Sequence, residues 1–191
     1  MTDYPNWFET SNAKTPFVLY MEEFYGKPDL NFLQIGAYCG HASTWLLANV
    51  LNEKGSILHD VDTWEGSNEP GHDGMDFSEV EKIYDSNMNL FTNVNKYKMT
   101  STEYLLSARD ERFDFIYIDG AHTAEQVMED ATLSWPLLKS GGIIAFDDYQ
   151  WPSPDGNEMH SPKPAVDFFL RLHKHEVDVL HNAWQVWLRK H

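Results

Sequence analysis

Short apolar runs of strand length alternate with longer amphipathic segments through the middle of the chain. The runs with strand character cover residues 31–35, 56–62, 94–99, 113–119 and 142–146. Apolar positions at helical spacing predict helices over 44–52, 77–90 and 123–138, and a short helix that begins at Ser101. Strands that alternate with helices are typical of a parallel sheet covered by helices on both faces.

The two ends of the chain carry a different pattern. A helix is predicted over residues 15–25, with Thr15 as N-cap and Pro16 at its first position. The glycine- and proline-containing stretches 63–74 and 151–163 are predicted loops, and 165–172 is a predicted helix. Residues 176–180 and 183–188 predict an antiparallel hairpin with its turn near His181 and Asn182.

Together these elements predict an α/β fold with a doubly wound, mostly parallel seven-stranded sheet and a C-terminal antiparallel hairpin. The length of 191 residues suits one domain with a sizeable core. Within it we expect an N-terminal helical extension over 1–30, a ligand-binding core over 31–149, and an acceptor loop, helix and closing hairpin over 150–191.

Composition excludes several classes of protein. No apolar stretch is long enough to cross a bilayer, and the polar, acidic start is unlike a secretory signal, so we expect a cytoplasmic location. The formal net charge of −16 disfavours nucleic acid and anionic membranes as partners, and it favours a small-molecule acceptor. The sequence leaves a homo-oligomer open.

The only cysteine, Cys39, excludes an intrachain disulfide, and we expect it to pack behind a loop rather than act as a nucleophile.

Two glycines follow the first strand and carry the main functional signal. Gly36 and Gly40 lie between the strand 31–35 and the next helix, where glycine lets the backbone approach a ligand closely. Neither G-x-G-x-x-G nor a P-loop is present. The second strand ends in an acid about twenty residues further on, where such folds bind ribose hydroxyls. Asp62 is the predicted acid and Asp60 is its rival, so the pattern favours a nucleoside-bearing cofactor without a pyrophosphate.

Three segments resemble one enzyme family. The run Gln34-Ile35-Gly36-Ala37-Tyr38-Cys39-Gly40 is similar to the first motif of class I S-adenosylmethionine (SAM)-dependent methyltransferases, a Rossmann-like family, and especially to its catechol-type O-methyltransferases. Residues 118–122, Ile-Asp-Gly-Ala-His, and residues 141–148 resemble the same group and the related sugar and small-molecule methyltransferases. The resemblance covers roughly residues 31–149.

The resemblance implies a cofactor site. Gly36, Tyr38 and Gly40 would line the methionine end of SAM, and Asp62 would bind its ribose. Gln34 stands where relatives usually carry Glu. The residues that the resemblance assigns to the cofactor are Gln34, Gly36, Tyr38, Gly40, Asp62, Ser101, Thr102 and Asp119, with Ser101 and Thr102 near the adenine.

Carboxylates at two neighbouring strand ends predict a metal site. Asp119 and Asp147 should lie about 5 Å apart on adjacent strands, and Asp148 follows directly. Crowded carboxylates repel one another unless a cation or protons intervene, and oxygen ligands suit Mg²⁺, Mn²⁺ or Ca²⁺. The resemblance implies the same three metal positions. The alternative is that these acids cap turns.

His122 is the predicted proton acceptor, with Asp119 beside it in the catalytic set. A neutral imidazole can take a proton from a hydroxyl near neutral pH. Its alternative role is to bond the loop. We therefore expect SAM-dependent methyl transfer to an oxygen of a small acceptor, assisted by a divalent metal. A SAM-binding domain without catalysis and a nicotinamide-dependent enzyme remain alternatives; Gln34 and Ala42, both departures from the family pattern, keep the first of these open.

Overall fold

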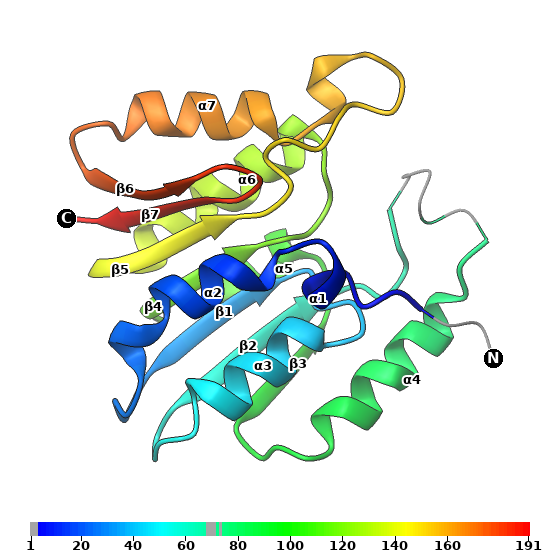
Figure 1. Ribbon diagram of the computed structural model, residues 1–191, viewed down its shortest axis with the longest axis vertical. Helices are drawn as coiled ribbons and strands as arrows, with labels where there is room; N and C mark the ends of the chain where they lie inside the picture. Colours follow the sequence, from blue (N-terminus) through cyan, green and yellow to red (C-terminus); the bar gives the residue numbers. More distant parts are fainter. Residues whose placement is uncertain (1–3, 68–71, 73) are drawn as a thin grey trace.

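The computed structural model describes residues 4–67, 72 and 74–191. Its seven strands form one sheet in the order β3-β2-β1-β4-β5-β7-β6 (Figure 1). The first five strands run parallel, and β7 lies antiparallel between β5 and β6. Their bounds are β1 (Asn31–Ile35), β2 (Ile57–Asp62), β3 (Val94–Lys98), β4 (Phe113–Ile118), β5 (Leu138–Phe146), β6 (Val177–Asn182) and β7 (Val186–Lys190).

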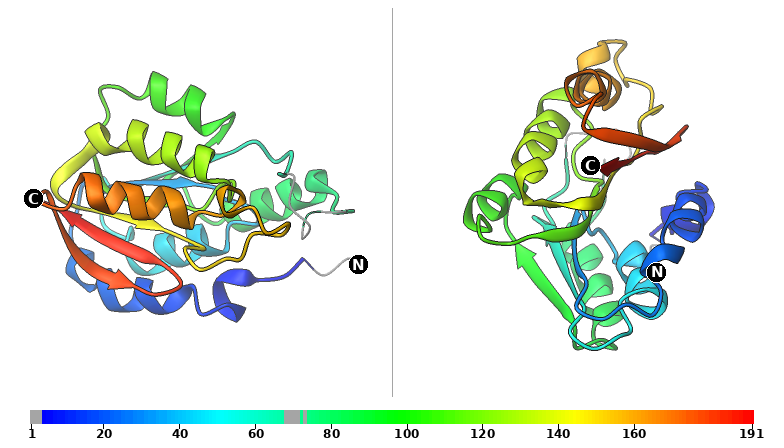
Figure 2. Two further views of the ribbon diagram at one scale, coloured as in Figure 1. Left: turned by 90° about the horizontal axis from the view of Figure 1, so that it is seen from above. Right: turned by 90° about the vertical axis from the view of Figure 1, so that its left-hand side faces the viewer.

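Helices cover both faces of this sheet (Figure 2). One face packs against α1 (Trp7–Thr10), α2 (Lys14–Tyr20), α3 (His41–Asn49) and α4 (Phe77–Met88). The other packs against α5 (Ser101–Ser107), α6 (Ala124–Ser134) and α7 (Lys163–Leu172). Short 3₁₀ turns occupy η1 (Glu22–Phe24), η3 (Trp135–Leu137) and η4 (Glu158–His160). The predicted doubly wound fold and its closing hairpin are confirmed.

An aromatic cluster ties the N-terminal helices to the sheet. Phe17 of α2 is fully buried and makes edge contacts with the rings of Phe115, Tyr117 and Trp187, at centroid distances of 6.0, 5.0 and 5.0 Å. These rings come from β4 and β7, so α2 bridges the parallel part of the sheet and the hairpin. Tyr117 also faces the candidate site described below.

The N-terminal helix differs from its prediction. The helix predicted over 15–25 is instead α2, which begins one residue before Thr15 and ends at Tyr20; Thr15 lies inside the helix, and Ala13 precedes it. The four-residue helix α1 was not predicted, although Asn6 caps it by accepting a hydrogen bond from the backbone of Glu9 at 3.1 Å. A single turn is too short to show helical periodicity in the sequence.

The boundary between α6 and β5 also differs. The predicted helix 123–138 ends at Ser134, because Pro136 has no N–H to continue the helical ladder, and a 3₁₀ turn follows. Strand β5 then starts at Leu138, four residues before the predicted strand 142–146, so Gly141 lies inside the strand rather than before it.

Other element boundaries shift by a few residues. Helix α3 begins three residues earlier than predicted, directly after Gly40, and α7 begins at Lys163. His181 and Asn182 belong to β6, and the turn of the hairpin lies over 183–185. Of the loop predicted over 63–74, residues 68–71 and 73 lie outside the described residues. Among the helices that the structure describes, none has the length and apolar character needed to cross a membrane.

Candidate active site

Four strand ends meet at one edge of the sheet. The last residue of β1, Ile35, pairs with Val61 of β2 and with Ile118 of β4, and Ile118 pairs with Phe146 of β5. The residues that follow these strands therefore emerge at the same level. In doubly wound sheets this carboxyl edge is where ligands bind, and it gathers the predicted glycine loop and the predicted acids.

The glycine loop fits closely against β4. Gly36 has a φ of +86°, and a Cβ on it would lie 1.9 Å from the backbone oxygen of Asp119. Gly40 has a φ of +76° and begins α3, with Met88 Cε 2.9 Å from where its Cβ would be. The positive φ strains any other residue at both positions, and at Gly36 a side chain would also collide with backbone.

Asp62 holds the loop in place. Its carboxylate accepts hydrogen bonds from the backbone N–H groups of Ala37, Tyr38 and Trp64, at 2.9, 2.9 and 2.7 Å. A carboxylate has about four acceptor sites, so about one stays available for a hydroxyl. Its rival Asp60 is fully buried, and Tyr84 donates to it at 2.9 Å. Between the two acids, only Asp62 lies at the edge.

Gln34 supports the loop from below. Its side chain is 2% exposed, and its amide donates to the backbone oxygen of Gly36 at 3.1 Å. Tyr38 adopts a left-handed φ of 49°, and its ring stacks on Trp7 of α1 at a centroid distance of 4.7 Å. The N-terminal segment thus covers the glycine loop. Cys39 is fully buried, and burial raises the pKa of its thiol to about 11, which disfavours a nucleophilic role.

Ser101 and Thr102 open helix α5 beside the carboxyl end of β3. Both are half-buried, and Thr100 precedes them as the N-cap, closing a capping box with Glu103. The capping box therefore holds the first turn of α5, which contains the two residues predicted to lie near the adenine.

Asp119, His122 and Asp148 form one group. Each offers one nitrogen or oxygen atom, and these atoms lie within 4.8 Å of one another. His122 Nε2 is 3.0 Å from Asp148 Oδ2, and the indole N–H of Trp184 donates to Asp148 Oδ1 at 2.9 Å. The ring of Trp151 lies 5.1 Å from that of His122. Two carboxylates and an imidazole at this spacing can hold a divalent cation.

Asp147 lies outside this group. Its carboxylate accepts hydrogen bonds from the Tyr117 hydroxyl, from Gln185 at 2.9 Å, and from the backbone N–H of Asp148 at 2.7 Å. The structure therefore brings two of the three predicted metal ligands together and adds His122 to them. Asp147 is held by side chains of β4 and the hairpin instead.

Burial and neighbouring charges raise the pKa values of Asp119 and Asp147. Burial and the charges of Asp147 and Asp148 raise the pKa of Asp119 well above its usual range, while His122 opposes the shift. Burial and the charge of Asp148 raise the pKa of Asp147 to about 6, against the hydrogen bond from Tyr117. Negative charge is concentrated at this edge, which attracts a cation.

Three contributors were not predicted from the sequence. Tyr117 lies two residues before Asp119, so strand alternation could have placed it on the same face. Trp184 and Gln185 precede β7, and no local signal in the sequence places β7 beside β5. Among the aromatic residues near this edge, Trp151 lies against the His122 ring, while Trp64 and Tyr149 are buried.

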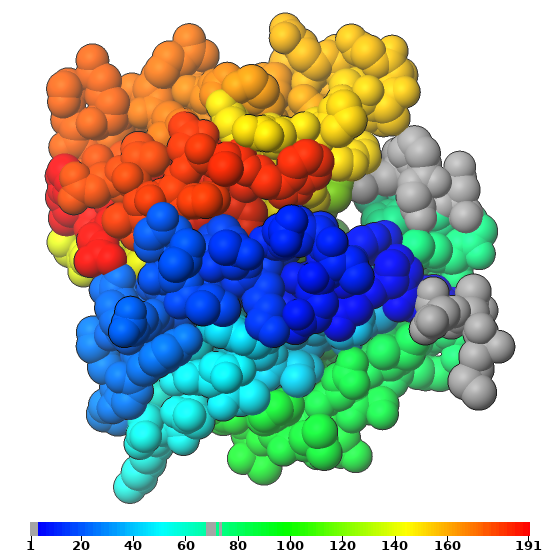
Figure 3. Space-filling model, viewed as in Figure 1, coloured from blue at the N-terminus to red at the C-terminus, as the bar shows by residue number. Residues whose placement is uncertain are grey.

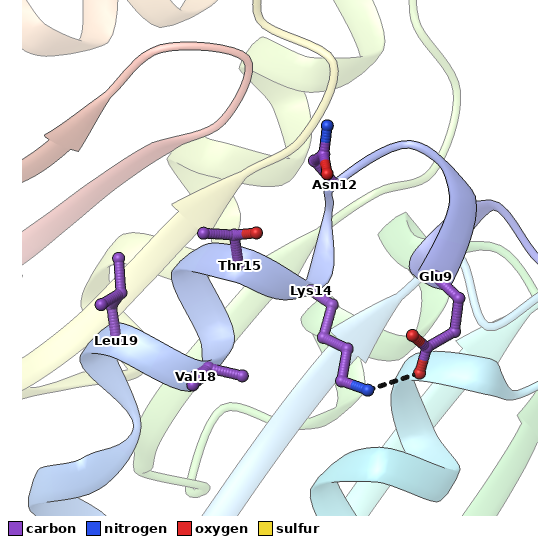
Figure 4. Close-up of a pocket in the computed structure, with 6 residues that line it drawn as sticks. All are labelled: Glu9, Asn12, Lys14, Thr15, Val18 and Leu19. Atoms are coloured by element: carbon purple, nitrogen blue, oxygen red, sulfur yellow. Dashed lines mark hydrogen bonds and ion pairs between the residues drawn. The ribbon is translucent and has the colours of Figure 1, made fainter.

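Two surface hollows lie beside the N-terminal segment, which crosses one face of the molecule alongside the hairpin (Figure 3). The first, on α2, is lined by exposed Val18 and Leu19 and by the Lys14–Glu9 ion pair (Figure 4). Nothing in that group points to a reaction. The second is lined in part by Trp184 and Gln185, whose side chains bond Asp148 and Asp147. It therefore adjoins the candidate site.

The family follows from a sequence comparison. A family model described as a methyltransferase domain matches residues 33–149, which span β1 to the loop after β5. This chain belongs to that methyltransferase family. The match includes the glycine loop, Asp62 and the group at the end of β4. No curated protein matches the methyltransferase at a significant level.

Solved structures share its fold. An O-methyltransferase from Bacillus cereus in complex with SAH has a TM-score of 0.65 and 18% identity, over 98% of this chain and 83% of that one. The O-methyltransferase NovP has a TM-score of 0.62 and 17% identity, over 84% and 71% of the two chains. The N-methyltransferase NodS from Bradyrhizobium japonicum has a TM-score of 0.62 and 13% identity, over 97% of both. These likenesses confirm the predicted architecture.

Proposed function

We propose that this methyltransferase transfers a methyl group from SAM to an oxygen of a small-molecule acceptor. The observation that carries the proposal is the placement of Asp119, His122 and Asp148 at the same sheet edge as the glycine loop. A methyl donor on the loop and acidic and basic side chains next to it are what an oxygen acceptor requires, because its proton must leave as the new bond forms.

The glycine loop, Asp62 and the start of α5 support the cofactor assignment. Gly36, Tyr38 and Gly40 would lie along the methionine end, Asp62 would accept from a ribose hydroxyl, and Ser101 and Thr102 would lie at the adenine. Gln34 would support the glycine loop through the hydrogen bond that its side-chain amide donates to the Gly36 backbone oxygen. The family match favours this cofactor over a nicotinamide.

A divalent cation fits the same edge. Asp119 and Asp148 would hold it, and the spacing of their oxygen atoms, which lie within 4.8 Å of one another, supports the fit. When bound, the cation orients acceptor oxygens and lowers the pKa of the attacking hydroxyl. Mg²⁺, Mn²⁺ and Ca²⁺ all suit carboxylate oxygen.

His122 accepts the proton in this proposal. Asp148 Oδ2 lies 3.0 Å from its Nε2 and orients the ring toward the edge. When bound, SAM would supply an electrophilic methyl group whose C–S bond electrons leave with the sulfur. The hydroxyl proton of the acceptor would pass to His122 as the new C–O bond forms. Alignment of the two substrates is the remaining task of the protein.

The test begins with calorimetric titration of the protein with SAH, followed by a SAH-release assay with SAM and a panel of hydroxylated small molecules. Turnover that stops with EDTA and returns with Mg²⁺ or Mn²⁺ supports the cation. SAH binding without turnover on any acceptor supports a non-catalytic binding domain instead.

His122→Ala is then compared with His160→Ala. His160 forms a similar pair with Asp155, 2.9 Å apart on an exposed loop, and serves as the matched control. We expect His122→Ala alone to lower kcat and to flatten the lower limb of the pH–rate profile. Should His122→Ala instead weaken Mn²⁺ binding and leave the limb in place, His122 is a metal ligand and the proton acceptor lies elsewhere.

A further inference from the structure

The turn of the C-terminal hairpin holds the loop that follows β5, and the two lie beside each other (Figure 1). The backbone N–H of Tyr149 donates to the backbone oxygen of Trp184 at 2.9 Å. The side-chain amide of Gln185 donates to Asp147 Oδ2 at 2.9 Å. The indole N–H of Trp184 donates to Asp148 Oδ1, also at 2.9 Å. Three consecutive residues after β5 are therefore each bonded to this turn.

The backbone of Asp148 is held in an uncommon conformation. Its φ is 52°, in the left-handed region that few residues with a side chain adopt. Such a residue persists where its surroundings fix it, and such residues cluster at functional sites. The backbone N–H of Asp148 donates to Asp147 Oδ1 at 2.7 Å. Asp147 therefore holds the backbone at this position, and the direction of the Asp148 side chain depends on other groups.

Those groups are Trp184 and His122, which lie at different oxygens of the Asp148 carboxylate. Oδ1 accepts the indole N–H of Trp184, and Oδ2 lies 3.0 Å from His122 Nε2. Trp184 is 40% exposed, so its ring adds little to the core, and its polar contact is the more specific one. Carboxylates that bind metals are commonly oriented by hydrogen bonds of this kind.

We propose that Trp184 is a positioning residue for the candidate cation site: its indole N–H holds the Asp148 carboxylate so that Oδ2 faces the cation. This inference rests on the proposed function, since it takes Asp148 as a cation ligand. The indole nitrogen is a donor only and has no lone pair to offer a cation. Trp184 therefore acts through Asp148.

A purely structural role is the alternative. The bond from Trp184 to Asp148 also ties the hairpin to the loop after β5, which would stabilise the fold whether or not a cation binds. Trp184→Phe separates the two roles, because it removes the indole N–H and keeps the backbone bond from Tyr149. A structural link lowers the unfolding midpoint and leaves the cation affinity of the folded protein unchanged. A positioning link changes that affinity.

The experiment measures Mn²⁺ affinity by electron paramagnetic resonance, which detects the unbound ion. The proteins are wild type, Trp184→Phe, Asp148→Ala and the double variant that combines both changes. Circular dichroism first establishes that each is folded at the titration temperature. Trp135→Phe is the matched control, because Trp135 lies just before β5, at the opposite edge of the sheet from Asp148.

We expect Trp184→Phe to weaken Mn²⁺ binding by about tenfold, as for loss of a hydrogen bond that orients a metal ligand. In the Asp148→Ala background the same change should have less than about a twofold effect, because the carboxylate that Trp184 holds is gone. Trp135→Phe should bind Mn²⁺ as wild type does.

Wild-type Mn²⁺ affinity in folded Trp184→Phe overturns the inference and leaves a link between turn and loop. Equal weakening with and without the Asp148 carboxylate also overturns it, because Trp184 would then act on the site by another route. If Asp148→Ala binds no measurable Mn²⁺, the comparison of Trp184→Phe with Trp135→Phe decides. Wild-type protein that binds no Mn²⁺ overturns the proposed cation and this inference with it, which is a distinct result.

Discussion

The difference in unfolding free energy between Asp60→Asn and wild type should shift in favour of the variant as pH rises. Asp60 is fully buried on β2, and burial raises its pKa from 3.8 to about 7, against hydrogen bonds from Ser43 and Tyr84. The folded state therefore holds this proton more tightly than the unfolded state does. The free energy of unfolding loses the contribution of Asp60 as pH rises from the unfolded pKa toward the folded one.

The magnitude follows from the shift. A rise of about three pKa units at about 1.4 kcal/mol per unit corresponds to roughly 4 kcal/mol. Below the unfolded pKa both states are protonated and the penalty is absent; above pH 7 it is complete. Asn does not titrate, so the difference in unfolding free energy between Asp60→Asn and wild type should climb by this amount and then level off.

The assay is urea denaturation of both proteins at pH 5, 6, 7 and 8, a range that contains roughly 3 kcal/mol of this rise. Asn keeps an oxygen for Tyr84 but replaces the second carboxyl oxygen by an NH₂ group, whose cost of about 1–3 kcal/mol does not depend on pH. The diagnostic quantity is therefore the slope of the difference against pH. Asp155→Asn is the control: hydrogen bonds lower the pKa of this exposed acid to about 2, so its difference should be flat over this range. Parallel curves for Asp60→Asn and wild type would refute the reasoning.

Three further outcomes are expected. Gly36→Ala should lower the unfolding midpoint and abolish SAH binding, because its Cβ would lie 1.9 Å from the Asp119 oxygen; a folded protein with wild-type SAH affinity would contradict the tight fit. Cys39 should resist iodoacetamide in the native protein at pH 8 and react in urea, since burial raises the pKa of its thiol to about 11. Mass spectrometry measures the labelled fraction, and equal labelling in both states would contradict this expectation. Tyr117→Phe should raise the pKa of Asp147 above about 6, because the Tyr117 hydroxyl favours the charged carboxylate. The pKa is measured from the carboxyl ¹³C chemical shift of Asp147 as a function of pH. An unchanged pKa in the variant would show that this hydrogen bond is unimportant.

The sequence was sufficient to predict the sheet and its winding. Buried runs such as 31–35 and 113–119 carry strand character throughout, and the acids that end them mark the carboxyl edge. Boundaries were predicted less well where one residue decides the outcome. Pro136 ends α6 early, and Gly141 and Gly142 lie in β5 although glycine usually interrupts a strand.

The candidate site was predictable only in part. Gly36, Asp62 and Asp119 follow strands directly, so their common position depends on parallel pairing alone. The environment of Asp147 depends on Gln185, and that of Asp148 on Trp184, which lie 38 and 36 residues further along the chain, at the hairpin. Local patterns contain no information about which edge a hairpin joins. The hydrogen bonds from Tyr117 and Gln185 to Asp147 could therefore not be predicted from the sequence.

The position of β7 between β5 and β6 has a consequence for synthesis on the ribosome. Until residues 184–190 have emerged, β5 presents an open row of backbone donors and acceptors, and the acids that follow it lack two of their partners. Open strand edges invite pairing with other chains. A nascent polypeptide of this type therefore stays prone to aggregation until β7 is in place, and removing β7 should lower solubility before it lowers helix content.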